Sequence, residues 1–146
     1  ALVRGIQDGT IEVVATDHAP HSEAEKAKGL AGSAFGIVGL ETAFPVLYTR
    51  LVLEDVLSLE RLVELMSVGP GRLFGLGGTI APGAPADIAV FDLGARYRIE
   101  SADFLSKGHA TPFEGWEVQG RNVMTLVDGR EVYRDASLGG CGIVGA

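Results

Sequence analysis

The chain has 146 residues, a formal net charge of −7, 47% hydrophobic residues and 21% charged residues. This length fits a single domain, and the composition excludes a low-complexity or charge-expanded chain, so we expect a buried core. Twelve Lys and Arg stand against nineteen Asp and Glu. Because phosphate binding draws on clustered cations and this chain has no such cluster, we expect no nucleic-acid partner.

The one cysteine, Cys141, lies in a glycine-rich tail, so no internal disulfide is expected and a reducing, cytoplasmic compartment is predicted. The longest apolar stretch, residues 35–53, is interrupted by Glu41 and Arg50 and is not expected to span a membrane. The sequence begins at Ala1, without a methionine and without a basic segment followed by an apolar run. We therefore expect no signal peptide and interpret the chain as a piece of a longer protein.

The first elements predict a helix end, a strand and a long loop. Residues 1–9 fit the end of a helix that closes on Asp8-Gly9. Residues 10–16 (TIEVVAT) form a β-branched run in which Val13, Val14 and Ala15 are consecutive apolar residues, which is typical of a parallel strand buried on both faces. Residues 17–39 then form a loop long enough to indicate a functional or mobile segment. A buried parallel strand needs neighbours on both edges, and their absence from this sequence is a second indication of a fragment.

Helical spacing dominates the middle of the chain. Apolar residues at helical intervals predict one helix over residues 40–54, with Pro45 tolerated only in its first turn. A second helix is predicted from about Ser58, a suitable N-cap. A short third helix could start at Pro70 and stop at Gly75.

Beyond residue 76, glycine and proline punctuate a run of short strands. The predicted strands cover residues 86–93, 97–100, 116–119, 122–127 and 131–134. Asp128-Gly129, between the last two, is a strong signal for a tight hairpin. The order of elements is therefore strand, long loop, helices and then strands.

One short motif combines a carboxylate with two imidazoles. Asp17 and His18 directly follow the predicted strand, and His21 comes three residues later. In parallel sheets that end of a strand is where ligands bind, but the spacing alone equally allows a solvated turn. A zinc site needs three or more protein ligands, and besides this motif the chain offers only His109 and Cys141 as ordinary donors. A self-contained zinc site is therefore not expected.

Several stretches together resemble one enzyme family. The stretch ATDHAPH (15–21) closely resembles a signature of dihydroorotases, which belong to the amidohydrolase superfamily. Downstream stretches resemble the same family in the same order: FGIVGLETAFPVLY (35–48), GTIAPGAPADIAVFD (78–92), SKGHATPFEGWEVQGR (106–121) and TLVDGREVY (125–133). The resemblance therefore runs over nearly the whole chain.

The resemblance implies roles for four residues. Asp17 would bind the catalytic zinc and act as general acid/base, taking a proton from the attacking water and delivering it to the departing ring nitrogen. His21 would bind the substrate carboxylate, and Phe35 and Gly36 would contact the pyrimidine ring through their main chain. Packing of the Phe35 side chain onto the rest of the protein is an equal alternative. We expect His18 to orient the Asp17 loop, with His109 on the surface and Cys141 inert.

The resemblance also implies a fold. The family fold is a (β/α)8 barrel with a small β-sandwich subdomain, so the chain is expected to be an α/β C-terminal fragment. Residues 1–76 would hold barrel strand eight and its following helices, and residues 77–146 the last strands of the β-subdomain. The remaining Zn²⁺ ligands would lie upstream of this chain. A complete barrel needs about 200 or more residues, so the fragment alone is expected to be inactive.

The full enzyme would interconvert dihydroorotate and N-carbamoyl-aspartate in pyrimidine biosynthesis. One alternative is another cyclic amidase, a hydantoinase or an allantoinase, although these lack a histidine at the position of His21. Another is a non-catalytic dihydroorotase-like subunit bound to aspartate transcarbamoylase, although such proteins tend to lose metal ligands such as Asp17. Homo-oligomerisation and association with the transcarbamoylase both remain open.

Overall fold

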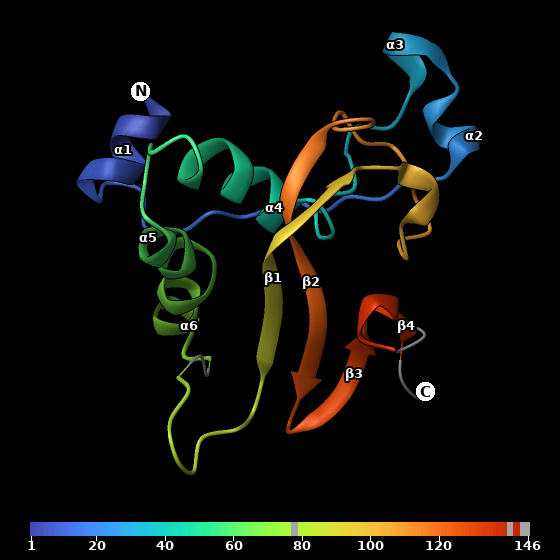
Figure 1. Cartoon of the computed structure of the whole chain (residues 1–146). Helices are drawn as coiled ribbons and strands as arrows, with labels where there is room; N and C mark the ends of the chain where they lie inside the picture. The colour runs from blue at the N-terminus through green and yellow to red at the C-terminus, as the bar shows by residue number, and fades with distance from the viewer. Residues whose placement is uncertain (77–78, 140–141, 144–146) are drawn as a thin grey trace.

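The computed structural model describes residues 1–76, 79–139 and 142–143. Helical elements occupy most of the first half, and a four-stranded antiparallel sheet follows in the order β1-β2-β3-β4. In Figure 1, α1, α5 and α6 lie to one side of the sheet, and α2 and α3 project from the other side. None of the helices in the described part of the chain is long and apolar enough to cross a membrane.

The N-terminal segment is extended but does not form the predicted strand. Helix α1 (Leu2–Asp8) ends at Gly9 in the left-handed conformation, which confirms the predicted helix end. Residues 11–16 have no strand partner among the described residues, and Glu12 and Ala15 are exposed. The expectation of a strand buried on both faces is therefore wrong for this chain, because no neighbouring strand supplies a hydrogen-bonded edge.

Helix contacts anchor this extended segment instead. The Val14 amide donates to the Leu65 carbonyl at 3.0 Å. The Arg61 guanidinium donates to the carbonyls of Ile6 (3.1 Å) and Ile11 (2.9 Å). These bonds satisfy backbone groups that a sheet would otherwise pair.

The predicted loop over residues 17–39 contains two short helices, α2 (Glu23–Lys26) and α3 (Gly29–Gly32). Ser22 and Glu25 form a capping box at the start of α2: each side chain accepts the backbone N–H of the other residue. The Ser22 amide and hydroxyl donate to the Glu25 carboxylate at 2.9 and 2.6 Å. The segment is therefore ordered by local polar contacts.

The middle of the chain is helical, as predicted. The first run comprises α4 (Ala43–Leu47) and the π-helical turn η1 (Tyr48–Val52). The second comprises α5 (Leu59–Val63), the π-helical η2 (Glu64–Val68) and α6 (Gly69–Phe74).

The predicted helix signals hold in both runs. Pro45 lies in the first turn of α4. Ser58 caps α5 through its hydroxyl, which accepts from the Arg61 amide at 3.1 Å. Helix α6 has Pro70 in its first turn and ends at Gly75 in the left-handed conformation.

The sheet contains fewer and longer strands than predicted. β1 (Ile88–Arg98) and β2 (Glu117–Val127) each merge two predicted strands, and β3 (Arg130–Arg134) and β4 (Gly142–Ile143) complete the sheet. Asp128 and Gly129 both have positive φ, 49° and 75°, which is the geometry of the predicted tight hairpin. Register shifts interrupt β1, so one continuous strand has two separate apolar patterns.

The core lies where the helices meet the sheet. Leu62 and Leu65 are fully buried on the second helical run. The Phe44 ring of α4 stacks on Phe91 of β1, with centroids 3.9 Å apart. Gly120 in β2 has a φ of 95°, and a Cβ there would approach the Phe44 ring to 3.1 Å, so glycine allows this close packing.

Candidate functional site

The DHAPH motif (17–21) follows the extended segment 11–16 and pairs with a distant part of the chain. Asp17 has a φ of 45°, a left-handed conformation that non-glycine residues rarely adopt but that Asp tolerates. His18 forms a parallel bridge with Ile37, and the Ala19 amide donates to the Ile37 carbonyl at 2.9 Å. The motif and residues 35–40 therefore lie side by side.

His18 ties these two segments together. Its Nδ1 accepts from the backbone N–H groups of Gly39 (3.1 Å) and Leu40 (3.3 Å). Because Nδ1 accepts both bonds, the neutral ring carries its proton on Nε2. These contacts fit the expected orienting role of His18 next to Asp17.

His21 contacts the segment that sequence analysis assigns to substrate binding. Its Nε2 lies 2.6 Å from the Phe35 carbonyl oxygen. A carbonyl only accepts hydrogen bonds, so Nε2 carries a proton in this arrangement. Nδ1 lies 4.0 Å from the Glu25 carboxylate. The hydroxyl and amide of Ser22 hold the pKa of that carboxyl below its usual value, and His21 lowers it further.

Phe35 and Gly36 lie against the DHAPH motif through their backbone. The Phe35 side chain is 94% exposed, so among the described residues it does not pack into the fold. Gly36 has a φ of 125°, and a Cβ there would lie 2.6 Å from the Ala19 Cβ and 3.2 Å from the His21 Nε2. Only glycine fits this close approach. The structure thus brings His21, Phe35 and Gly36 together.

Two positioning features were missed by the sequence analysis. The Lys26 ammonium donates to the carbonyls of Ala34 and Gly36, each at 2.9 Å. On the other side of the motif, a Cβ at Gly108 would lie 2.9 Å from the Pro20 Cβ and 3.1 Å from the His21 amide nitrogen. The stretch SKGHATPF contained the signal for the second feature, since an internal glycine in a loop can mark a close backbone approach.

Asp17 is the predicted site residue that has no described contact with His21, Phe35 or Gly36. Its side chain is exposed and makes no hydrogen bond among the described residues. Residues 1–76, 79–139 and 142–143 contain no cluster of three or more His, Cys, Asp or Glu side chains that could hold a metal ion. His109 is exposed, and its Nδ1 contacts the Ser101 carbonyl. Cys141 lies outside the described residues. The described part of the chain therefore does not form a metal site by itself.

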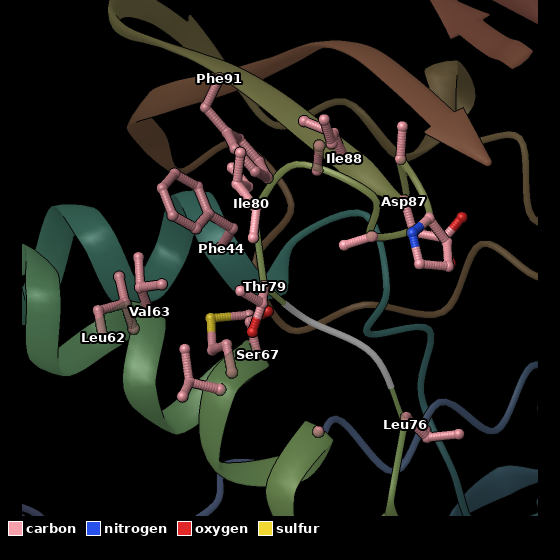
Figure 2. Close-up of a pocket in the computed structure, with 18 of the residues that line it drawn as sticks. Phe44, Leu62, Val63, Ser67, Leu76, Thr79, Ile80, Asp87, Ile88 and Phe91 are labelled. Carbon is pink, nitrogen blue, oxygen red and sulfur yellow. The ribbon is translucent and has the colours of Figure 1, made fainter. Parts of the chain in front are cut away.

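An apolar cleft lies elsewhere in the described part of the chain. A cleft of about 970 Å³ opens between the α5–α6 run and β1, and Figure 2 shows residues from both walls. Its walls are mainly apolar and include Leu62, Val63, Ile80, Ile88 and Phe91. None of the four predicted site residues, Asp17, His21, Phe35 and Gly36, lines this cleft. The cleft and the DHAPH motif are therefore separate features of the described chain.

These features agree with the family comparison, in which the Amidohydrolase family matches residues 1–132. The chain belongs to this family. Within it, the chain is 56% identical to the dihydroorotase of Lactiplantibacillus plantarum over 135 residues, and 54% identical to that of Bacillus caldolyticus over 134 residues. Each alignment covers 91% of this chain and 31% of the relative. The predicted resemblance to dihydroorotases is confirmed.

Solved structures of hydantoinases share the fold. The L-hydantoinase (dihydropyrimidinase) of Arthrobacter aurescens is 35% identical with a TM-score of 0.81, over 90% of this chain and 30% of that protein. The D-hydantoinase (dihydropyrimidinase) of a Thermus species is 31% identical with a TM-score of 0.86, over 99% of this chain and 32% of that protein. The chain thus spans about a third of the length of the proteins that it matches.

Proposed function

We propose that this chain is the C-terminal part of a zinc-dependent dihydroorotase, which reversibly hydrolyses the cyclic amide of dihydroorotate to N-carbamoyl-aspartate in pyrimidine biosynthesis. The contact between His21 and the Phe35–Gly36 backbone, next to the segment that carries Asp17, is the observation that carries the proposal. This contact places the His21 imidazole, the proposed anion-binding group, beside the Phe35–Gly36 backbone, the proposed contact surface for the pyrimidine ring. Identity of 51–56% to dihydroorotases supports the same assignment.

Asp17 is proposed as the proton-transfer group. Its carboxylate is exposed at the end of an extended segment and free of hydrogen bonds among the described residues, so it can accept a proton from water. The water oxygen then bonds to the ring carbonyl carbon, and as the C–N bond of the ring breaks, the same carboxyl can return the proton to the nitrogen. A bound zinc ion would polarise the ring carbonyl and make the water more acidic. Asp17 would be one of its ligands, and the others would come from residues that this chain does not contain.

His21 is proposed to bind the substrate carboxylate. A histidine side chain can donate a hydrogen bond to an anion, and the His21 Nδ1 is not bonded to the Phe35 carbonyl. The backbone of Phe35 and Gly36 would contact the pyrimidine ring. The exposed Phe35 side chain is available to pack over the ligand or against the rest of the enzyme.

We further propose the division of the chain that the resemblance implies. Residues 1–76 would complete a (β/α)8 barrel as strand eight and its helices, and residues 77–146 would belong to a β-sandwich subdomain. In the complete barrel, residues 11–16 would pair with strands that this chain lacks. The fragment alone would be inactive, because its described residues contribute only one carboxylate at the motif. A cytoplasmic location, homo-oligomerisation and association with aspartate transcarbamoylase also belong to this proposal.

The second candidate is a hydantoinase, because the solved structures that share the fold carry that name. Kinetics of the full-length protein that carries this chain would separate the two. Dihydroorotate is expected to be hydrolysed, with a kcat/KM at least about a hundredfold above those for hydantoin and allantoin, because only dihydroorotate offers a carboxylate to His21. A preference for hydantoin would overturn the dihydroorotase assignment.

A further inference from the structure

We propose that Lys26 is a positioning residue for this reaction, and that it holds residues 34–36 in the conformation in which His21 and the Phe35–Gly36 backbone meet the substrate together. This inference rests on the proposed function. It also goes beyond that function, because the resemblance gives Lys26 no role. The starting point is that one ammonium group binds two carbonyls that flank Phe35.

Two side chains bind the three consecutive backbone carbonyls of residues 34–36. The Lys26 Nζ donates to the carbonyls of Ala34 and Gly36, both at 2.9 Å. The Phe35 carbonyl between them lies 2.6 Å from the His21 Nε2. The Ala34 carbonyl lies in the peptide plane before Phe35, and the Gly36 carbonyl lies in the plane after Gly36. Fixing both planes restricts the Phe35–Gly36 plane between them, whose carbonyl faces His21.

Polar bonds, not apolar packing, fix this segment. The Phe35 side chain is 94% exposed and adds no burial within the described residues. An ammonium group has three donors, and hydrogen bonds from a charged donor are stronger than neutral ones. Lys26 is itself partly buried, which strengthens its bonds further. Removal of this ammonium would leave two carbonyls without their donor.

Further hydrogen bonds fix the backbone of Lys26. The Ser33 hydroxyl donates to the Lys26 carbonyl at 2.6 Å, and the Ala34 amide donates to the Glu25 carbonyl at 3.3 Å. Residues 25–36 thus form a closed loop with Lys26 at its centre. The side chain of Lys26 is pre-positioned, so little further ordering is needed when a ligand binds.

The consequence for substrate binding is a population effect. If the loss of Lys26 leaves residues 34–36 in the binding conformation only about 1–10% of the time, the apparent affinity falls by about ten- to a hundredfold. The described contacts of Lys26 do not include Asp17, the proposed proton-transfer group. Lys26 should therefore act on KM far more than on kcat.

The test uses the full-length protein that carries this chain, with Lys26→Met as the main variant. Methionine keeps much of the side-chain length and removes the donors. We expect KM for dihydroorotate to rise by about ten- to a hundredfold, with kcat within about threefold of the unmodified protein and with unchanged zinc content. Lys26→Arg, which keeps the charge and the donors, should restore much of the affinity. The matched control is Lys28→Met on the exposed neighbouring lysine, which should leave KM unchanged.

A second measurement separates this inference from the proposed function. The imidazole ¹⁵N shifts of His21 should show a single Nε2-protonated form in the unmodified protein and a mixture of tautomers in Lys26→Met. Ser33→Ala, which loosens Lys26 without removing it, should change both KM and the ¹⁵N shifts in the same direction but by less. This variant also serves if Lys26→Met does not fold.

The outcomes are distinct. An unmodified protein without dihydroorotase activity would overturn the proposed function, and the ¹⁵N shifts would then decide the role of Lys26. An active protein in which Lys26→Met leaves KM and the His21 shifts unchanged would overturn the positioning role. A Lys26→Met variant in which kcat falls as much as KM rises, thermal stability also falls and Lys26→Arg restores nothing would overturn it too. That result would indicate a general structural role for Lys26.

Discussion

The Glu41 carboxylate binds Ser106 twice, accepting from its amide at 3.1 Å and from its hydroxyl at 2.6 Å. The same carboxylate accepts from the Leu105 amide at 2.7 Å. These three bonds attach the loop that contains Gly108 to the start of the first helical run. Because a Cβ at Gly108 would lie 3.1 Å from the His21 backbone, the position of this loop supports His21.

Glu41→Ala is therefore expected to destabilise the full-length protein by about 1–3 kcal/mol, since it leaves three donors without their charged acceptor. Chemical denaturation measures this loss. The control is Glu54→Ala, which removes an exposed ion pair with Arg50 and should cost less than about 1 kcal/mol. Equal losses from the two variants would contradict a special role for Glu41.

Gly36→Ala should damage the site by steric overlap. A Cβ at residue 36 would lie 2.6 Å from the Ala19 Cβ and 2.7 Å from the Ala19 carbonyl oxygen. The matched control is Gly83→Ala, which also has a positive φ, 86°, but open space around its Cβ. The site variant is expected to lose about 1–3 kcal/mol more stability than the control, measured by thermal unfolding. Similar losses would show that backbone strain, not overlap, dominates.

The start of α2 should respond to acid through Glu25. The hydroxyl and amide of Ser22 lower the pKa of Glu25 from its ordinary value of 4.5, so the folded segment favours the carboxylate. Its stabilising contribution is then fully present above pH 4.5 and is lost as the pH falls through the lowered pKa. The Ser22 amide shift, followed by NMR against pH, should have its midpoint below 4.5 and lose this transition in Glu25→Gln. A midpoint at or above the ordinary value would contradict the capping box as the cause.

The isolated chain of 146 residues is expected to fold poorly or to self-associate. Residues 11–16 lack strand partners, and β1 has β2 on one side only among the described strands. The apolar cleft beside β1 also exposes hydrophobic side chains, among them Leu76 (68% exposed) and Ile80 (86% exposed). Sedimentation should show oligomers. A monomer with cooperative unfolding and coincident transitions by two probes would contradict this expectation.

Local signals predicted the elements whose causes are local. Ser58, Pro70 and Gly75 mark helix ends because capping and backbone preference act over a few residues. The hairpin at Asp128-Gly129 follows from positive φ at two adjacent positions. These features hold whatever surrounds them.

Features that depend on distant partners could not be predicted in the same way. The run of apolar residues within 11–16 is typical of a buried strand, but a strand forms only where another strand pairs with it. The partners of Lys26 are backbone carbonyls, which have no residue identity to read. His21 and Phe35 came from a family resemblance, and their contact became visible only in the folded loop.

Zinc analysis combined with kinetics on Asp17→Asn and His21→Ala in the full-length protein tests the proposed division of roles between Asp17 and His21. Asp17→Asn should lower kcat by at least about 10²–10⁴-fold, because it removes the proton acceptor and weakens zinc binding. His21→Ala should keep zinc and raise KM about ten- to a hundredfold, because it removes a contact of about 1.5–3 kcal/mol to the substrate carboxylate. Loss of zinc in His21→Ala, with zinc and activity retained in Asp17→Asn, would contradict the assignment.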